Sequence, residues 1–171
     1  EPGEGPLARG HLVAGCGEES TVADQFAGTW IYNTAESTVQ CFDTAPLAQP
    51  PVPNKTFARG VGAAEIVDLS VSPLERPRGI ICNFAFDIAG PTARLRKNQT
   101  CNLNAIDVLT IDEDGAGQPL WTFSLTSATT AQELATATIH IFHQAEIPGD
   151  PPTEETCSWS LVAGLTRIAK D

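Results

Sequence analysis

Alternation of apolar and polar residues with a period of two is the feature that most constrains how this chain folds. The clearest example has apolar residues at every second position, namely Ile80, Cys82, Phe84, Phe86 and Ile88. Similar alternation marks residues 121–126, 136–141 and 157–161. Because successive side chains of a β-strand point to opposite faces, this period predicts strands with one buried face.

Helix signals are scarce. Only residues 61–67 and 131–135 have helix-forming composition, and stretches this short are not stable alone. We therefore expect at most a short turn of helix. About eight to ten short strands, separated by turn and loop signals, predict an all-β fold that is either an antiparallel β-barrel, lipocalin-like in form, or a β-sandwich.

Two strand assignments are specific enough to be tested. Residues 28–32 and 37–42 are expected to form a hairpin whose turn is 33–36. In residues 67–71, Val67, Leu69 and Val71 are expected on the buried face and Asp68 on the exposed one.

Residues 1–25 are small, acidic and without periodicity, so we expect a flexible leader tail, followed by one antiparallel β domain over 26–171. Two proline-rich loops, 44–54 and 145–156, are long enough to carry function. The chain has 10 Lys and Arg against 21 Asp and Glu, a formal charge of −11. That balance argues against nucleic acid and anionic lipid as partners, since both require a basic face.

Four of the five cysteines stand in or beside strand-like segments: Cys41, Cys82, Cys101 and Cys157. They are widely spaced and lack zinc-ligand spacing, so we expect no metal site. Scattered strand cysteines are typical of disulfides formed in an oxidising compartment, although reduced, buried thiols are the alternative. The sequence does not choose among the three possible pairings of four cysteines.

Cys16 follows Leu12-Val13-Ala14-Gly15, which resembles a bacterial lipobox, the site where a signal peptidase cleaves and a cysteine receives a lipid. Residues 1–11 lack the basic end and apolar run of such a signal. Two interpretations remain open, a lipidated Cys16 and a cysteine in a leader tail that is free or paired with another molecule.

No recognisable catalytic motif is present. The chain lacks G-x-S-x-G, a Walker loop, G-x-G-x-x-G and H-E-x-x-H. His140 and His143 lie in strand-like sequence, which places them on opposite faces, and Asp112-Glu113-Asp114-Gly115 fits a hairpin turn better than a calcium loop. We therefore predict no catalytic residue, no metal, no cofactor and no enzymatic activity.

Two resemblances follow from short motifs. Phe26-Ala27-Gly28-Thr29-Trp30 resembles the G-x-W opening of lipocalins and fatty-acid-binding proteins, which implies that Trp30 closes one end of a barrel and that a late arginine, here Arg167, packs over it. The wider order of motifs resembles small Ser/Thr-rich secreted lipoproteins of myxobacteria, whose function is not established. Those motifs are G-T-W at 28–30, C-N-F at 82–84, Q-T-C at 99–101, W-T-F at 121–123 and T-C-x-W at 156–159.

Two functions are consistent with this sequence. In the first, an exported barrel, anchored through a lipid if Cys16 is modified, binds a small apolar ligand with aromatic residues lining the interior: Trp30, Phe84, Phe86, Trp121 and Phe123. In the second, a cell-surface module with a filled core contacts a protein partner through its long loops. Both place the protein outside the cytoplasm, either secreted or anchored at the outer membrane. The first requires a cavity of roughly 300 Å³ or more, whereas the second requires a filled interior and an exposed apolar patch or free strand edge.

Overall fold

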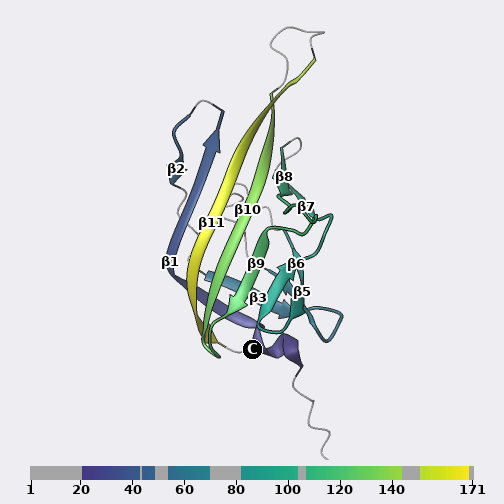
Figure 1. The fold of residues 1–171 in the computed structure, drawn as a ribbon, viewed down its shortest axis with the longest axis vertical. Coiled ribbons are helices and arrows are strands. Elements are labelled where there is room, and N and C mark those ends of the chain that lie inside the picture. Colours follow the sequence, from purple (N-terminus) through teal and green to yellow (C-terminus); the bar gives the residue numbers. More distant parts are fainter. Residues whose placement is uncertain are drawn as a thin grey trace, which may run out of the picture.

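The computed structural model describes residues 21–42, 44–48, 54–69, 82–103, 107–143 and 151–169. These residues form a 3-10 helix and an antiparallel sheet of eleven strands (Figure 1). The elements are η1 Val22–Gln25, β1 Gly28–Cys41, β2 Leu47–Ala48, β3 Asn54–Arg59, β4 Glu65–Asp68, β5 Ala85–Ala89, β6 Thr92–Leu95, β7 Thr100–Asn102, β8 Val108–Ile111, β9 Trp121–Leu125, β10 Thr130–His143 and β11 Thr153–Ala169. The predicted all-β, antiparallel class is confirmed.

Eight of the strands close into a ring. Neighbours pair in the order β1, β3, β4, β5, β6, β9, β10, β11, and β11 pairs with β1 to complete the circle. This order is also the order along the chain, so the ring is an up-and-down barrel. Of the two predicted architectures, the barrel is the one that forms.

The sheet divides along the length of β10. Residues 131–135 of β10 pair with β9 inside the ring, whereas residues 137–140 pair with β8. Beyond the ring, β1, β11, β10, β8 and β7 continue as an open sheet, which gives the molecule its elongated shape (Figure 1). The eleven strands exceed the eight to ten expected. Two short strands contribute to the excess: β2, which pairs with β1, and β7, which pairs with β8.

The predicted hairpin at residues 33–36 is wrong. β1 runs through this segment without a turn and pairs with β11 along its whole length, from Thr29 with Ala169 to Cys41 with Cys157. A register shift between Tyr32 and Thr34 bends the strand instead. The polar residues taken as a turn lie on the outer side of a strand at the surface, where polarity carries no turn signal.

The predicted faces of β4 are also wrong. Ile66 and Asp68 are buried, Val67 is half-buried and Leu69 is exposed. Asp68 faces inward because it joins a buried ion pair, described below. The alternation predicted for 80–88 is confirmed in the described part, since Cys82, Phe84 and Phe86 are buried and Ile88 packs against the core. A turn at 89–92 joins β5 to β6, with Gly90 at a φ of 60° that disfavours other residues.

The barrel interior is filled by aromatic rings. Phe123 lies 5.1 Å from Trp30 and 4.8 Å from Phe57 between ring centroids, and Trp121 lies 5.3 Å from Trp159. Edge-on and tilted contacts of this kind add to the stabilisation from burial of the rings themselves. Where these rings lie, the barrel interior is therefore a packed core rather than an open cavity.

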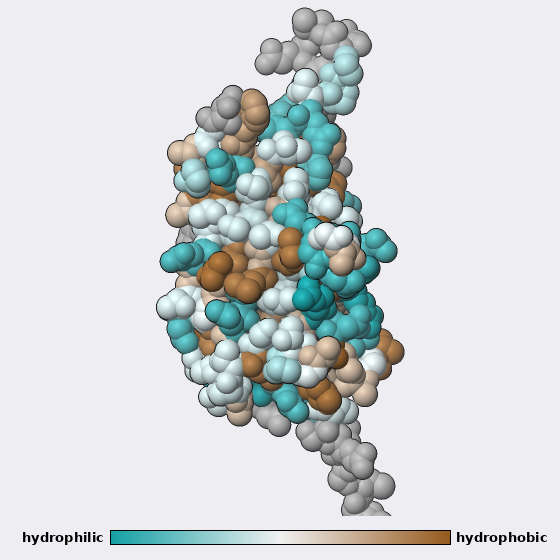
Figure 2. Space-filling view, viewed as in Figure 1, coloured by the Kyte–Doolittle hydropathy of each residue, from teal (hydrophilic) through white to brown (hydrophobic). Residues whose placement is uncertain are grey.

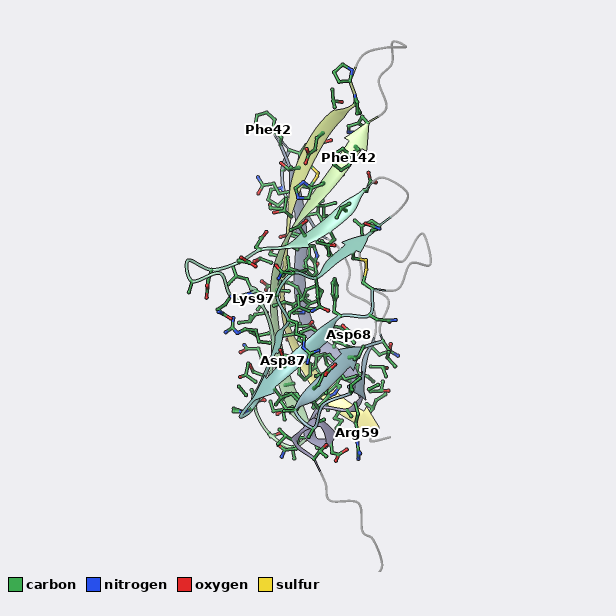
Figure 3. All side chains as sticks on the ribbon, turned by 90° about the vertical axis from the view of Figure 1, so that its right-hand side faces the viewer. Phe42, Arg59, Asp68, Asp87, Lys97 and Phe142 are labelled. Carbon is green, nitrogen blue, oxygen red and sulfur yellow. A yellow bond between two sulfur atoms is a disulfide. The ribbon has the colours of Figure 1, made fainter. Side chains whose placement is uncertain are left out.

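Two disulfides are present, so the disulfide interpretation of the four strand cysteines is confirmed. Cys41 is joined to Cys157 across the β1–β11 pair, and Cys82 is joined to Cys101. Figure 3 draws these sulfur bonds among the side chains. Cys16 lies outside the described residues, and so does the prediction of its lipidation.

The folded part begins before Phe26. η1 lies within the segment expected to be a leader tail, and its Ala23 is buried against the core. No helix in the described residues has the length and apolar character needed to span a membrane.

Candidate functional site

Five side chains form a polar network inside the barrel, which we call the Lys55 cluster: Lys55, Asp68, Glu133, Tyr32 and Trp121. They come from five strands, β3, β4, β10, β1 and β9. Each stands at an inward position of its strand, in line with buried apolar neighbours such as Phe57 beside Lys55 and Ile66 beside Asp68. Barrel closure, and not sequence proximity, brings them together.

Lys55 lies between two carboxylates. Its Nζ is 2.8 Å from Asp68 Oδ2 and 2.5 Å from Glu133 Oε1. The side chains of Lys55, Asp68 and Glu133 are 4%, 6% and 0% exposed. Pairing of this kind is what permits charged groups to remain buried.

Two further donors hold Glu133. Tyr32 donates its hydroxyl to Glu133 Oε2 at 2.7 Å, and Trp121 donates Nε1–H to Oε1 at 2.7 Å. Both carboxylate oxygens therefore accept hydrogen bonds from fixed partners. The orientation of Glu133 relative to Lys55 is set by the surrounding strands.

The cluster shifts the ionisation of Lys55 and Tyr32. Burial lowers the pKa of Lys55, but the negative charges of Asp68 and Glu133 outweigh it and raise that pKa well above its ordinary value. Burial, reinforced by the charge of Glu133, raises the pKa of Tyr32 well above its ordinary value. One ammonium and two carboxylates leave the cluster with a formal charge of −1.

The five aromatic residues predicted to line a ligand cavity are all buried. Trp30 and Phe123 pack on each other, and Trp121 contacts both Phe84 at 5.3 Å and Phe86 at 6.3 Å between ring centroids. The structure thus brings them together as one core. Their role in binding a ligand stays a prediction.

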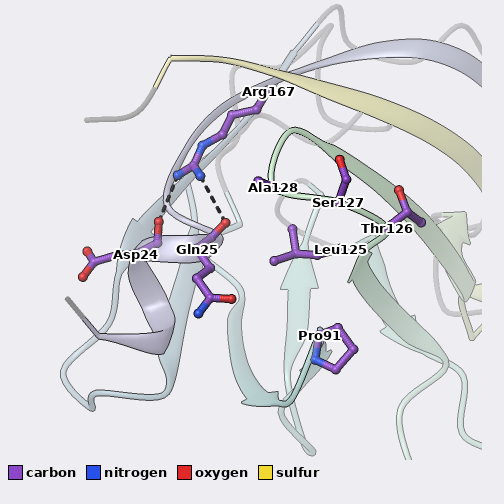
Figure 4. A pocket seen from close by; sticks show the side chains of 8 residues that line it. All are labelled: Asp24, Gln25, Pro91, Leu125, Thr126, Ser127, Ala128 and Arg167. Atoms are coloured by element: carbon purple, nitrogen blue, oxygen red, sulfur yellow. Dashed lines mark hydrogen bonds between the residues drawn. The ribbon is translucent and has the colours of Figure 1, made fainter.

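A hollow of about 450 Å³ lies at the end of the barrel where η1 packs (Figure 4). Its walls are formed by η1, the β5–β6 turn, the end of β9 with the turn that follows, and β11, with the residues Asp24, Gln25, Pro91, Leu125, Thr126, Ser127, Ala128 and Arg167. Arg167 donates to the main-chain oxygens of Asp24, Gln25 and Ala27. The Arg167 guanidinium thus satisfies main-chain oxygens of η1 and of the residues that follow it.

Arg167 also lies over Trp30, with Cζ 5.4 Å from the ring centroid. The contact expected from the G-x-W motif is therefore present in the structure. It ties the last strand of the ring to the first.

A second hollow, of about 480 Å³, lies beside the Cys82–Cys101 disulfide. Phe84 is on its wall, but most of the wall is polar: Asn83, Asn98, Gln99, Thr100 and Asn102. Such a lining suits a polar molecule better than an apolar one.

The histidines and the cysteines supply no metal centre within the described segments. His140 Nδ1 lies 2.6 Å from Glu154 and His143 Nε2 lies 3.3 Å from Glu155, so each ring is engaged by a different carboxylate. Cys41 and Cys157 bring their sulfurs near Glu155, within 4.8 Å. Both sulfurs belong to a disulfide, which removes the thiolates that would bind a metal.

The outer face of β1, β11 and β10 is rich in hydroxyl groups. We call six of its uncharged residues the hydroxyl face: Thr38, Gln40, Thr136, Thr138, Ser158 and Ser160. Thr38 pairs with Ser160, and Ser160 with Thr136, across the three strands. Next to this row, Leu134 pairs with Val162, and the two are 44% and 51% exposed. Figure 2 shows this side of the molecule with pale areas, several teal groups and a brown area near its middle.

Comparisons with known proteins give no assignment. No protein-family model matches the sequence, and no curated protein matches it. Among solved structures, a multidomain protein including DUF1735 from Bacteroides ovatus is 10% identical, with 82% of this chain and 48% of that chain covered and a TM-score of 0.34. A protein of unknown function from the same organism is 11% identical, with 82% and 47% covered and a TM-score of 0.33. This chain spans about half the length of either protein, and likeness at these TM-scores assigns no function.

Proposed function

We propose that this chain is a non-enzymatic, extracytoplasmic β-barrel domain that acts as a protein-interaction module. The observation that carries the proposal is the filled interior: the aromatic residues expected to line a ligand cavity pack on one another instead. A rigid barrel of this kind acts through its surface. The two disulfides support a location in an oxidising compartment. A secreted form and a form anchored through a lipid on Cys16, as the resemblance to myxobacterial lipoproteins implies, are both part of the proposal.

The surface we assign to the partner is the hydroxyl face together with the Leu134–Val162 pair. An exposed apolar pair beside side chains that bear hydroxyl groups has the composition expected at the centre of a protein interface, and Glu36, the partner of Val162 on β1, places a charge at the edge of that pair. The protein as a whole carries a formal charge of −11. The residues of the hydroxyl face carry no charge themselves, so a partner that covers them desolvates little charge there. Phe42, 80% exposed near the opposite end from η1, adds an apolar group at the tip of β1 (Figure 3).

Photo-crosslinking in the producing cell tests this assignment. A photoreactive residue replaces Gln132, which is exposed on β10 two positions from Leu134. We expect a discrete crosslinked protein that disappears when Leu134→Thr and Val162→Thr are combined. The control is the same probe at Val61, which is fully exposed on the β3–β4 turn. Equal crosslinking from both positions, or none from Gln132, would contradict the assignment.

Binding of a small ligand is the second candidate, and the hollow beside Arg167 is the observation that favours it. Its volume of about 450 Å³ exceeds the roughly 300 Å³ that ligand pockets require. Leu125, Pro91 and Ala128 supply apolar wall, and Thr126 and Ser127 supply hydroxyl groups. Native mass spectrometry of protein from its own host decides between the candidates. A mass excess removed by organic extraction supports a ligand, and the absence of any extractable excess supports the interaction module.

A further inference from the structure

We propose that the Lys55 cluster is a modification site, at which Lys55 and Asp68 become joined by an intramolecular amide bond. The proposal is independent of the function proposed above. The observation behind it is the juxtaposition of an amine, a carboxyl group and a second carboxylate in a buried site. Three features of the structure support this chemistry.

The first feature is proximity. Nζ of Lys55 and Oδ2 of Asp68 are 2.8 Å apart, so the amine is in contact with the group that it would attack. Phe57 pairs with Asp68 between β3 and β4, which makes Lys55 the diagonal neighbour of Asp68 on the inner face. Because the barrel holds both strands, the reaction within the molecule takes place at a high effective concentration.

The second feature is a proton carrier. Glu133 Oε1 lies 2.5 Å from Nζ, within reach of the protons that amide formation must move. Tyr32 and Trp121 hold this carboxylate by the hydrogen bonds described above. Glu133 is thus the catalytic residue of the proposed step, and Tyr32 and Trp121 are positioning residues.

The third feature is exclusion of water. The side chains of Lys55, Asp68 and Glu133 are at most 6% exposed. The rings of Phe57 and Trp121 cover Nζ, with centroids 5.5 Å and 5.1 Å away. Since amide formation releases water, a site that water cannot readily re-enter favours the joined product over the separate groups.

The step is balanced without any co-reactant. One proton passes from the Lys55 ammonium to the Asp68 carboxylate, which gives a neutral amine and a neutral carboxylic acid. Nζ then attacks Cγ of Asp68 and forms the new C–N bond. Glu133 takes the second proton from Nζ and delivers it to the departing hydroxyl, so the C–O bond breaks and one water molecule leaves. Glu133 returns to the carboxylate, and the formal charge of the cluster stays −1.

Mass measurement of the reduced and alkylated wild-type protein is the primary test. We expect the whole chain to be lighter than its sequence by one water molecule. Digestion then locates the loss of water within the chain. In the joined protein trypsin fails to cut after Lys55, and the peptide ending at Arg59 remains attached to residues 60–78. A chain of full mass that is cut normally after Lys55 would overturn the proposal.

Variants identify the participating groups. Asp68→Ala and Lys55→Arg remove one reacting group each and should restore the full mass. Glu133→Gln keeps the shape of the side chain but removes the proton carrier, and should leave most of the chains unjoined. Lys97→Arg, at an exposed position outside the cluster, is the matched control and should leave the joined fraction unchanged. If Glu133→Gln, shown to be folded by circular dichroism, were joined as completely as wild type, the role of Glu133 would be wrong.

Discussion

Arg167 and Trp30 are register partners in β11 and β1, and the guanidinium of Arg167 lies on the indole of Trp30. Both side chains also hold the segment that leads into the barrel. Trp30 donates Nε1–H to the oxygen of Phe26 at 2.9 Å, and Arg167 donates to the oxygen of Asp24 at 3.0 Å. The first and last strands of the ring are thus tied to η1 at one point.

Replacement of Arg167 by glutamine should lower the free energy of unfolding by about 2–4 kcal/mol, because charged hydrogen bonds to several carbonyls and a cation–π contact are lost. Urea denaturation measures the change. Arg59→Gln is the control, since Arg59 also contacts Asp24 but its side chain is 49% exposed; we expect a loss of about 1 kcal/mol or less there. Equal losses would show that Arg167 does not organise this end of the barrel.

Phe123→Ala should cost about 3–5 kcal/mol, because it leaves a cavity in a packed core. Phe42→Ala, at an exposed position, should change stability by no more than about 0.5 kcal/mol. Thermal or urea unfolding of the two variants provides the comparison. A loss below about 1 kcal/mol at Phe123 would instead indicate a loosely filled interior, as a ligand cavity requires.

The two disulfides should contribute unequally to stability. Cys41 and Cys157 are separated by 116 positions, whereas Cys82 and Cys101 are separated by 19. From the entropy of closing each loop in the unfolded chain, we expect a loss of about 4–5 kcal/mol for Cys41→Ser with Cys157→Ser, and about 3 kcal/mol for the other pair. Urea denaturation of both double variants without reductant tests this order. A greater loss from the shorter loop would contradict it.

Alkaline pH should destabilise the protein through Tyr32. Its pKa is raised in the folded state above the ordinary value of 10.0. Above that value the unfolded chain loses the phenolic proton while the folded protein retains it. The unfolded state then binds fewer protons, so stability falls as pH rises toward the folded pKa.

Tyr32 is the only tyrosine in the chain, so tyrosinate absorbance follows this group directly. In the folded protein the absorbance change should occur at a higher pH than in urea. Tyr32→Phe should show a smaller loss of stability above pH 10.0 than wild type. A folded-state titration at the ordinary pKa would contradict the prediction.

The sequence predicted strands well where one face meets the core and the other meets water. β9 matches the predicted alternation closely, with Trp121 and Phe123 buried and Thr122 and Ser124 half-buried. The sequence-based prediction failed in the middle of β1, where a run of polar residues belongs to an exposed strand and not to a turn. Closure of the barrel depends on contacts between β1 and β11, which are distant in sequence, so no local pattern reveals it.

The Lys55 cluster was not found from the sequence, although each member carries a signal. Lys55 lies two positions before Phe57 and therefore on the same face of β3. Glu133 lies between Ala131 and Ala135 on the buried side of β10. A charged residue at an inward position is expected to have a partner of opposite charge. Asp68 was assigned to the exposed face because Val67 and Leu69 are more apolar, whereas the inward position follows from its pairing with Lys55.

Because the sheet divides along β10, some strands can change in length without affecting the pairing that closes the barrel. β8 pairs with β10 at residues 137–140, beyond the part of β10 that pairs with β9, and β7 pairs with β8. β2 pairs with β1 alone. None of these three strands therefore supplies a hydrogen bond needed to close the ring. Changes of length in the loops that join them leave the pairing of the eight ring strands unchanged, whereas β8 itself adds Leu109 and Ile111 to the core. Related chains can therefore differ in length between β1 and β3 and between β6 and β9 while they keep the same barrel, which makes these two excursions the places where new binding surfaces can evolve.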